Sequence, residues 1–273
     1  MASVQPGQSI WRSALLWGLG VVILTGLAWG SFLAGPVIAI PTPESQSRSS
    51  LYTYRDRPSS DGIGKVYLGR EIAKVMGYEG AGWLERGGRE NQEKPSVAIA
   101  ALNLKPDDVV ADIGAGTGYF STRLAPLVPQ GKVLAVDVQP EMIDILHWMK
   151  GEYQLDNLIP VLADEQDPHL PEREVDVVLM VDVYHELAYP HEVMEKIVQS
   201  LKPGGRVIAL EYRAENPFIL IKRHHKMSLA QLRREMATVS LTLSASPKIL
   251  PQQHYAVFSQ DIKEEEKPKI YSG

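Results

Sequence analysis

The sequence predicts an α/β domain built on a doubly wound, mostly parallel sheet of seven strands, with helices on both faces. From about residue 94 onward, short apolar runs alternate with segments of helical pattern, and this order is typical of parallel sheets with helical crossovers. A glycine-rich turn directly follows the first apolar run. With 273 residues, of which 44% are hydrophobic, the chain has room for one such domain and an appendage.

The apolar runs predicted as parallel strands cover residues 108–113, 132–138, 158–163, 175–181 and 206–212. Helical patterns between them cover residues 119–127, 141–150 and 191–201, and the crossover after the third strand is short. A further helix at 228–239 precedes two late strands at 241–243 and 255–259, which we expect to form a hairpin-like pair at the sheet edge. In such a sheet the binding crevice lies at the carboxyl ends of the strands.

The composition excludes several kinds of site. The chain has 28 Lys and Arg against 33 Asp and Glu, a formal net charge of −5, which argues against a broadly basic nucleic-acid-binding surface. It contains no cysteine, so disulfides, thiolate zinc sites and cysteine nucleophiles are all excluded.

The N-terminal segment is strongly apolar. Residues 14–34 contain no charged side chain, and as a helix they would span roughly 30 Å, the hydrocarbon thickness of a bilayer. We therefore expect a membrane anchor here. A cleaved signal peptide ending before Ile40 is the first alternative, and a buried core helix is the second.

The remaining organisation follows from composition. We expect a hydrophobic segment, a solvated linker rich in Pro, Ser and Thr, a helical lid, the α/β domain and a charged tail, which cover residues 1–40, 41–60, 61–95, 96–262 and 263–273 in that order. The lid is predicted from the many glycines around a helical pattern at 65–76, and it would bring Tyr67, Trp83 and Arg86 near a bound substrate. A simple helical cap on the sheet is the alternative.

The glycine-rich turn is the first candidate binding element. Gly114, Gly116 and Gly118 follow a predicted strand and open a predicted helix. Glycines there allow unusual backbone dihedrals and let a ligand approach the main chain closely. The free N–H groups at the start of the helix favour a carboxylate or phosphate. A turn that only connects a strand to a helix is the alternative.

Acidic residues stand at the ends of three predicted strands, at Asp112, Asp137 and Asp164. Asp137 can accept hydrogen bonds from both ribose hydroxyls of a nucleoside-containing cofactor, and Asp164 can accept one from an adenine amino group. Helix capping or solvation is the alternative for each acid taken alone. Their ordered placement favours one shared crevice.

These pieces resemble the class I S-adenosylmethionine-dependent methyltransferases, a family with a Rossmann-like fold. The resemblance rests on Asp112-Ile-Gly-Ala-Gly-Thr-Gly118, Val136-Asp137, Ala163-Asp164, residues 176–182 and Leu201-Lys-Pro-Gly-Gly-Arg206, and it covers residues 96–260. Residues 61–86 resemble the N-terminal region of uncharacterised bacterial members, which carry a signal or anchor.

The resemblance implies S-adenosyl-L-methionine as the cofactor, and it assigns a role to each matching residue. The glycines would line the methionine moiety and Asp112 would help to hold its amino group. Asp137 would bind the ribose, Val138 would pack on the adenine and Asp164 would contact the adenine amine. Asp182, at the end of the fourth strand, would face the methyl donor or acceptor.

Catalysis of methyl transfer requires mainly that the acceptor is held in line with the methyl group, because the sulfonium donor is already activated. The candidate catalytic residues are Asp182, His185 and Glu186. His185 would titrate near neutral pH and Glu186 would orient it, with simple packing as the alternative for His185. We expect no metal, because Tyr189 and Pro190 break the HExxH pattern that His185 begins. His224 and His225 are predicted as a polar loop pair.

The acceptor is left open as a small molecule, a lipid or a protein side chain. Arg213, Lys222, Arg223 and Lys226 would recognise an anionic acceptor or form a solvated loop. Two other functions are kept as alternatives. One is a non-catalytic membrane module that binds S-adenosylmethionine. The other is a nicotinamide-dependent oxidoreductase, which the GxGxG spacing disfavours.

The expected location follows from charge and cofactor supply. Arg12 precedes the apolar segment, whereas Arg48, Arg55 and Arg57 follow it, so the positive-inside bias favours a cytoplasmic C-terminal domain. S-adenosylmethionine is made in the cytoplasm and its fixed charge crosses bilayers poorly. We therefore expect a single-pass membrane protein, anchored through residues 14–34, whose domain meets a small-molecule or lipid-like acceptor. An exported, periplasmic protein is the alternative.

Overall fold

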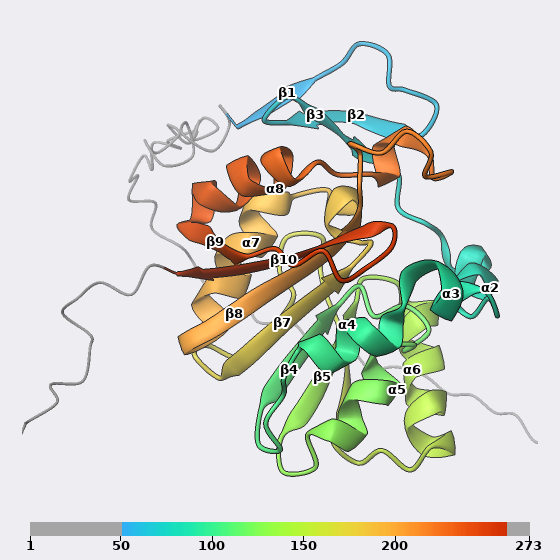
Figure 1. Ribbon diagram of the computed structural model, residues 1–273, viewed down its shortest axis with the longest axis vertical. Helices are drawn as coiled ribbons and strands as arrows, with labels where there is room; N and C mark the ends of the chain where they lie inside the picture. Colours follow the sequence, from blue (N-terminus) through green and yellow to red (C-terminus); the bar gives the residue numbers. More distant parts are fainter. Residues whose placement is uncertain (1–50, 261–273) are drawn as a thin grey trace, which may run out of the picture. The chain divides into compact units, whose positions relative to one another are not determined.

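A computed structural model describes residues 51–260 and confirms the predicted α/β fold. Its large sheet consists of β4 (Val109–Ile113), β5 (Lys132–Asp137), β6 (Leu158–Leu162), β7 (Val175–Val181), β8 (Leu201–Tyr212), β9 (Leu241–Ala245) and β10 (Gln253–Gln260). The strand order is β6-β5-β4-β7-β8-β10-β9 (Figure 1). The first five strands are parallel, and β10 is antiparallel to both β8 and β9. The late strands therefore form the expected edge pair.

Helices cover both faces of this sheet. On one face α4 (Pro95–Ala101), α5 (Ser121–Leu124) and α6 (Pro140–Glu152) pack against alternate strand residues, and on the other face α7 (Pro190–Ser200) and α8 (Leu229–Met236) pack against the intervening ones. Within β5, for example, Val133 contributes to the first core and Leu134 to the second. Burial on both faces explains why the parallel strands are continuous apolar runs in the sequence.

The starts of the main helices follow from local sequence. Proline occupies the first turn of α4, α6 and α7, where its fixed φ suits the helix and its missing N–H costs no hydrogen bond. Helix α8 begins after Ser228, whose hydroxyl accepts a hydrogen bond from the backbone N of Gln231 at 3.1 Å, as an N-cap residue does.

The predicted helix at 65–76 is wrong. The segment forms β2 (Gly62–Tyr67) and β3 (Arg70–Ala73), which pair antiparallel through the two-residue turn Leu68-Gly69. Both turn residues have positive φ, 47° and 90°, as the tight turns of hairpins require. With β1 (Tyr52–Tyr54) these strands make a separate three-stranded sheet, so the stretch predicted as linker already contains a strand. Helical structure starts only later, with η1 (Tyr78–Gly80), α2 (Ala81–Leu84) and α3 (Arg89–Glu93).

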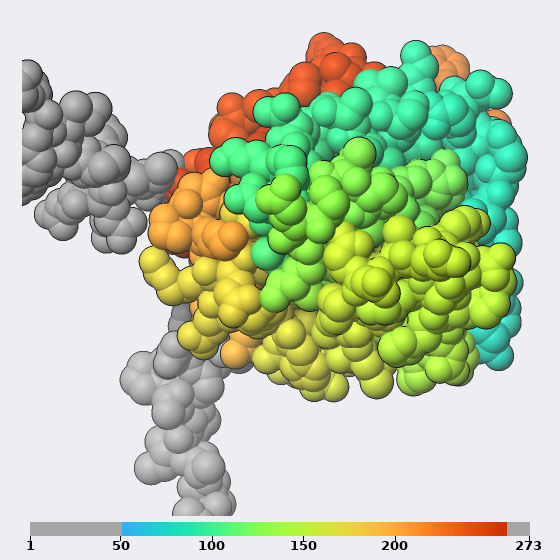
Figure 2. Space-filling model, turned by 90° about the horizontal axis from the view of Figure 1, so that it is seen from below, coloured from blue at the N-terminus to red at the C-terminus, as the bar shows by residue number. Residues whose placement is uncertain are grey.

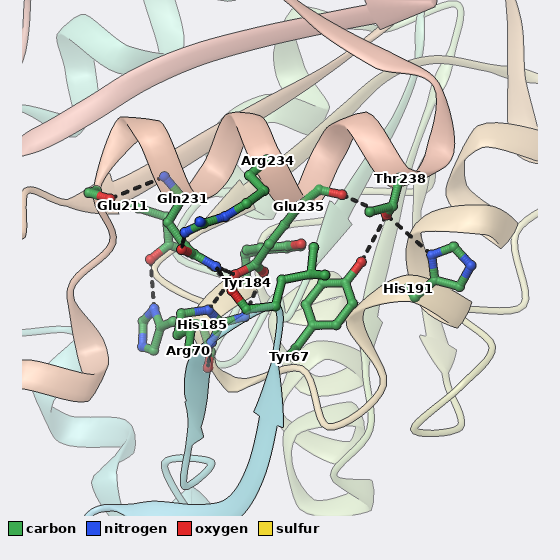
Figure 3. A network of polar contacts seen from close by, with 12 residues as sticks. Tyr67, Arg70, Tyr184, His185, His191, Glu211, Gln231, Arg234, Glu235 and Thr238 are labelled. Carbon is green, nitrogen blue, oxygen red and sulfur yellow. Dashed lines mark hydrogen bonds and ion pairs between the residues drawn. The ribbon is translucent and has the colours of Figure 1, made fainter. Parts of the chain in front are cut away.

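The small sheet is anchored by polar contacts on α8 and on η5 (Ala237–Val239), the 3-10 turn that follows it (Figure 3). The Tyr67 hydroxyl lies 2.8 Å from Thr238 Oγ1, and two guanidinium nitrogens of Arg70 each donate to Glu235 at 2.8 Å. Tyr67 is fully buried in this contact. It does not line the main cavity, so its expected place beside a substrate is wrong.

The two ends of the chain lie outside the described residues, and with them lie the predicted anchor at 14–34 and the predicted tail at 263–273. Among residues 51–260, none of the helices combines the length and the apolar composition that crossing a bilayer requires.

A close backbone approach makes Gly131 a sensitive position. A Cβ atom added there would stand 1.9 Å from the carbonyl oxygen of Asp108, in the backbone just before β4. We expect Gly131→Ala to lower the free energy of unfolding by about 2–3 kcal/mol, because the backbone must move to relieve the overlap. Urea denaturation measures the change.

Gly151→Ala is the matched control. Gly151 lies near the end of α6, and a Cβ atom added there meets nothing within 4 Å. We expect this variant to raise the free energy of unfolding by about 0.5–1 kcal/mol, because alanine loses less backbone entropy than glycine in a helix. Equal stability of the two variants would contradict the packing argument.

Candidate functional site

A cavity of about 680 Å³ opens at the carboxyl ends of the parallel strands. The structure brings most of the predicted site residues to its wall, namely Gly114, Gly116, Asp137, Val138, Asp164, Asp182, His185 and Glu186. Asp112 and Gly118 do not line it. The cavity therefore lies where a doubly wound sheet is expected to bind its ligand.

The glycine loop is shaped by both dihedral angle and space. Gly114 and Gly116 have φ values of 67° and 55°, a region that side chains with a Cβ atom disfavour. A Cβ atom at Gly116 would also lie 2.6 Å from Leu84 of α2. Gly118 has a different role, because an added Cβ atom there would meet Leu146 of α6 at 2.8 Å. The first two glycines keep the loop open beside the cavity, and the third lets α6 pack closely.

Asp137 ties this loop to the start of α6. Its Oδ2 accepts a hydrogen bond from the backbone N of Gly116 at 2.9 Å, and its Oδ1 accepts one from Gln139 N at 3.0 Å. Burial raises the pKa of Asp137, although these backbone hydrogen bonds oppose the rise. A buried carboxylate is thus held at the cavity wall by main-chain donors.

The other two predicted acids differ in their surroundings. Asp112 is 2% exposed and accepts a hydrogen bond from the Ser121 hydroxyl at 2.6 Å, and burial raises its pKa to about 6. Asp164 is exposed at the mouth of the cavity, where it lies 3.1 Å from His169 Nε2. Asp112 therefore braces the glycine loop from within, while Asp164, although paired with His169, is accessible to a ligand in the cavity.

Asp182 follows β7 in a strained conformation, with φ at 51°. One carboxyl oxygen accepts a hydrogen bond from Gln253 Nε2 at 2.7 Å. The other is shielded from solvent and has no hydrogen-bond partner among the described residues. Burial, with Glu93 and Glu211 nearby, raises the pKa of Asp182 well above its usual range. An unpartnered polar atom at a cavity wall is a ready contact for a ligand.

His185 is almost fully buried in the short helix η3 (Tyr184–Glu186). Its Nδ1 lies 2.6 Å from Glu211 Oε2, at the end of β8, and the other oxygen of Glu211 accepts a hydrogen bond from Tyr184 N at 2.9 Å (Figure 3). Burial alone would lower the pKa of His185, but Glu211 and Glu186 outweigh it and raise the pKa to about 10. The sequence placed this pKa near neutrality, and the paired carboxylates are the reason for the difference.

A second histidine meets His185 from the loop after β8. His225, in η4 (Arg223–His225), has its Nδ1 3.0 Å from His185 Nε2 and 3.1 Å from Glu186 Oε1. Burial would raise the pKa of Glu186, but its contacts with both histidines lower it to about 2. The loop is closed at its base, where Ala214 N donates to Met227 O and Met227 N donates to Tyr212 O.

The sequence missed Glu211 and His225. Glu211 stands at the end of a parallel strand, and the rule that pointed to Asp137 also applies to it. His225 had no local signal, because its neighbours in the site come from a strand end 40 residues earlier in the chain.

The predicted basic cluster is not assembled at the cavity. Of its four residues only Lys222 lines the wall, and its ammonium lies 2.6 Å from Asp61 Oδ1. Arg213 donates instead to the carbonyls of Leu250 and Pro251, and Lys226 donates to that of Ile219. These two side chains hold loops together. Trp83 and Arg86 do line the cavity, as expected, and Arg86 pairs with Glu93.

The helical segment before β4 contributes residues to the cavity wall. In the space-filling view, turquoise atoms of this segment lie directly against green atoms of the first half of the α/β domain (Figure 2). Leu84 of α2 contacts the glycine loop, and Arg89 of α3 donates to the carbonyl of Leu84 at 2.9 Å. The position of Trp83 is thus fixed relative to the loop.

Comparison with known proteins agrees with this geometry. Residues 111–207 match a methyltransferase domain family. A demethylmenaquinone methyltransferase of Symbiobacterium thermophilum is 30% identical over 122 residues, which are 44% of this chain and 48% of that protein. An uncharacterised methyltransferase of Mycobacterium tuberculosis is 35% identical over 99 residues, 36% of this chain and 37% of that one. The chain thus spans half or less of the length of these relatives.

A solved structure shares the fold. The S-adenosylmethionine-dependent methyltransferase of Aquifex aeolicus superposes with a TM-score of 0.62 at 22% identity, over 67% of this chain and 99% of that one. Residues 111–207, which match the family, contain the end of β4, all of β5, β6 and β7, the glycine loop and the acids at the strand ends. On this sequence match, residues 111–207 form a domain of the class I S-adenosylmethionine-dependent methyltransferase type, whose methyl donor is S-adenosylmethionine.

Proposed function

We propose that this protein transfers the methyl group of S-adenosylmethionine to a small, largely apolar acceptor by in-line displacement. The observation that carries the proposal is one cavity whose wall contains both the glycine loop and the polar cluster after β7. A donor and an acceptor bound in that cavity would be neighbours, and such proximity is the main requirement of methyl transfer.

The donor side is formed by the loop and the end of β5. Gly114 and Gly116 would face the methionine moiety, and Asp137 would receive the ribose hydroxyls at a carboxylate that main-chain donors already hold. Val138 and Asp164, both exposed in the cavity, would meet the adenine. When bound there, S-adenosylmethionine supplies a methyl group on a positively charged sulfur.

The acceptor side is formed by the turn after β7 and by apolar residues of the same cavity wall. Asp182, His185 and Glu186 supply polar atoms there, and Val75, Trp83 and Leu220 supply an apolar rim. Trp83 is 50% exposed and Leu220 is 96% exposed, so the rim offers a large apolar surface to a ligand that enters from outside.

An apolar rim favours a lipid-like acceptor over an anionic one. The demethylmenaquinone methyltransferase among the relatives acts, by its name, on such a molecule. The apolar segment at 14–34 would hold the domain at a membrane, on its cytoplasmic side, where both donor and lipid are within reach. Incubation of the protein with labelled donor and separate lipid, small-molecule and protein pools tests the acceptor class. Label in the lipid pool is the expected result. A protein that binds the donor but labels no pool would be a non-catalytic module.

Asp137→Ala tests the donor side. The variant loses a charge-assisted pair of hydrogen bonds to the ribose, and we expect binding of S-adenosylhomocysteine to weaken by about 2–4 kcal/mol, or roughly 30- to 1000-fold. Isothermal calorimetry measures this affinity. The matched control is Asp144→Ala, which removes an exposed carboxylate of α6 outside the cavity wall, and its affinity should equal that of the wild type. Unchanged binding by Asp137→Ala would remove this residue from the site.

Trp83→Ala tests the acceptor side. We expect transfer of label to the acceptor pool to fall at least about tenfold, because an aromatic side chain of this size contributes much of the apolar contact of a site. Binding of S-adenosylhomocysteine should stay within about threefold of the wild type, since half a kcal/mol or so is a small indirect effect. Trp148→Ala, which truncates an exposed tryptophan of α6 away from the cavity, is the control. Equal labelling by both variants would place the acceptor elsewhere.

A further inference from the structure

Three ligand-type atoms converge at the cavity wall after β7. They are Nε2 of His185, Nδ1 of His225 and Oε1 of Glu186. The two nitrogens are 3.0 Å apart, and the carboxylate oxygen lies 3.1 Å from His225 Nδ1 and 3.7 Å from His185 Nε2. All three residues line the cavity, and their ligand atoms lie within 4.8 Å of one another.

The outer nitrogen of each histidine faces a carboxylate. His185 Nδ1 lies 2.6 Å from Glu211 Oε2, and His225 Nε2 lies 3.0 Å from Asp61 Oδ2. At His185 the carboxylate accepts a hydrogen bond, which keeps a proton on the outer nitrogen, and at His225 the negative charge of Asp61 favours a proton there without an aligned hydrogen bond. In the metal-free chain a proton lies in the 3.0 Å contact between the two inner nitrogens, and each inner nitrogen presents a lone pair once a metal ion takes the place of that proton.

With that proton displaced, three lone pairs point at one another, and a metal ion among them would be held by all three. Imidazoles that donate their outer N–H to a carboxylate and face inward with a lone pair are the pattern of histidine metal ligands. The charged side chains around the three atoms also favour a cation. The cluster holds the carboxyl groups of Glu186, Glu211 and Asp61, and Lys222, which pairs with Asp61, adds one ammonium. A dication would offset buried negative charge.

The distances fit a metal ion. Zinc binds histidine nitrogen at roughly 2.0–2.1 Å and carboxylate oxygen at roughly 2.0–2.2 Å, so tetrahedral ligands stand about 3.3–3.5 Å from one another. The observed separations of 3.0, 3.1 and 3.7 Å lie on both sides of that value. Small side-chain rotations would equalise them.

We propose that His185, Glu186 and His225 bind a divalent first-row transition-metal ion and leave its remaining coordination positions open to the cavity. Two imidazoles and one carboxylate are a donor set that suits zinc and iron(II). The sequence argued against a metal because the second histidine is missing from the helical spacing of HExxH. The structure supplies that histidine from the loop after β8 instead.

The open positions indicate an acceptor class, and this step rests on the proposed methyl transfer. An acceptor hydroxyl that coordinates the ion loses its proton more readily, and the proton passes to solvent water. The oxygen then forms a bond to the methyl carbon as the carbon–sulfur bond breaks, and that electron pair returns to sulfur to give neutral S-adenosylhomocysteine. The site is thereby suited to O-methylation of an apolar molecule with an ionisable hydroxyl.

Zinc binding by the full chain, prepared without a polyhistidine tag and stripped with a chelator, tests the metal site. We expect one zinc ion per chain in competition with a chromogenic chelator. His225→Ala removes a ligand and should weaken binding at least about 100-fold, because loss of a supporting partner alone typically costs 10- to 100-fold. Asp61→Asn removes such a partner, and we expect a loss in that smaller range. His225 is preferred over His185, whose near-complete burial makes its replacement a risk to folding.

His224→Ala is the matched control. It removes the adjacent imidazole, which lies 3.5 Å from Glu71 and outside the cavity wall, and zinc affinity should not change. No zinc binding by the wild type, full affinity in His225→Ala, or an equal loss in His224→Ala would each overturn the metal site and leave a proton shared by the two rings. S-adenosylhomocysteine binding is measured on the same samples. A chain that binds zinc but transfers no methyl group would sustain the site and contradict only the proposed function.

Discussion

Burial of Glu211 is the constraint on which the site depends. Its side chain is fully shielded from solvent, and an ionised carboxylate in such a place is stable only when donors surround it. One oxygen holds the backbone of Tyr184 and the other holds the ring of His185. Arg70 reaches the same turn from the small sheet and donates to the carbonyl of His185 at 3.1 Å. Strand β8, the turn after β7 and the small sheet are thus linked through one turn of chain.

The site is assembled from segments that have little else in common. The proposed donor side belongs to the first half of the large sheet, where Asp137 fixes the glycine loop to α6. The proposed acceptor side combines the turn after β7 with Asp61, beside the small sheet, and His225, in the loop after β8. Polar contacts hold these segments together, whereas apolar packing holds the two cores of the large sheet together. A chemistry that differs between relatives is therefore more easily changed on the acceptor side than on the donor side.

The sequence predicted most of the fold because strands buried on both faces are continuous apolar runs, and the acids that end them mark one edge of the sheet. It failed at residues 65–76. Their apolar side chains fit a helix as well as a hairpin, and Leu68, with a positive φ of 47°, gives none of the usual sequence signals of a tight turn. It also failed at His225, because no local pattern records which strand end a distant loop will meet. The periodicity of apolar residues predicts local helices and strands, but it does not predict which distant segments come into contact in the folded chain.

The loop between Tyr212 and Met227 combines a fixed base with an exposed tip. Hydrogen bonds and a parallel bridge between Arg213 and Met227 fix the two ends of the loop on the sheet. Its tip carries Phe218 and Leu220, which are almost fully exposed. Insertions or exchanges at such a tip cost little stability, because few contacts depend on it. Exchanges at this tip can therefore reshape the proposed acceptor surface while the glycine loop and Asp137, which belong to other segments, keep their geometry.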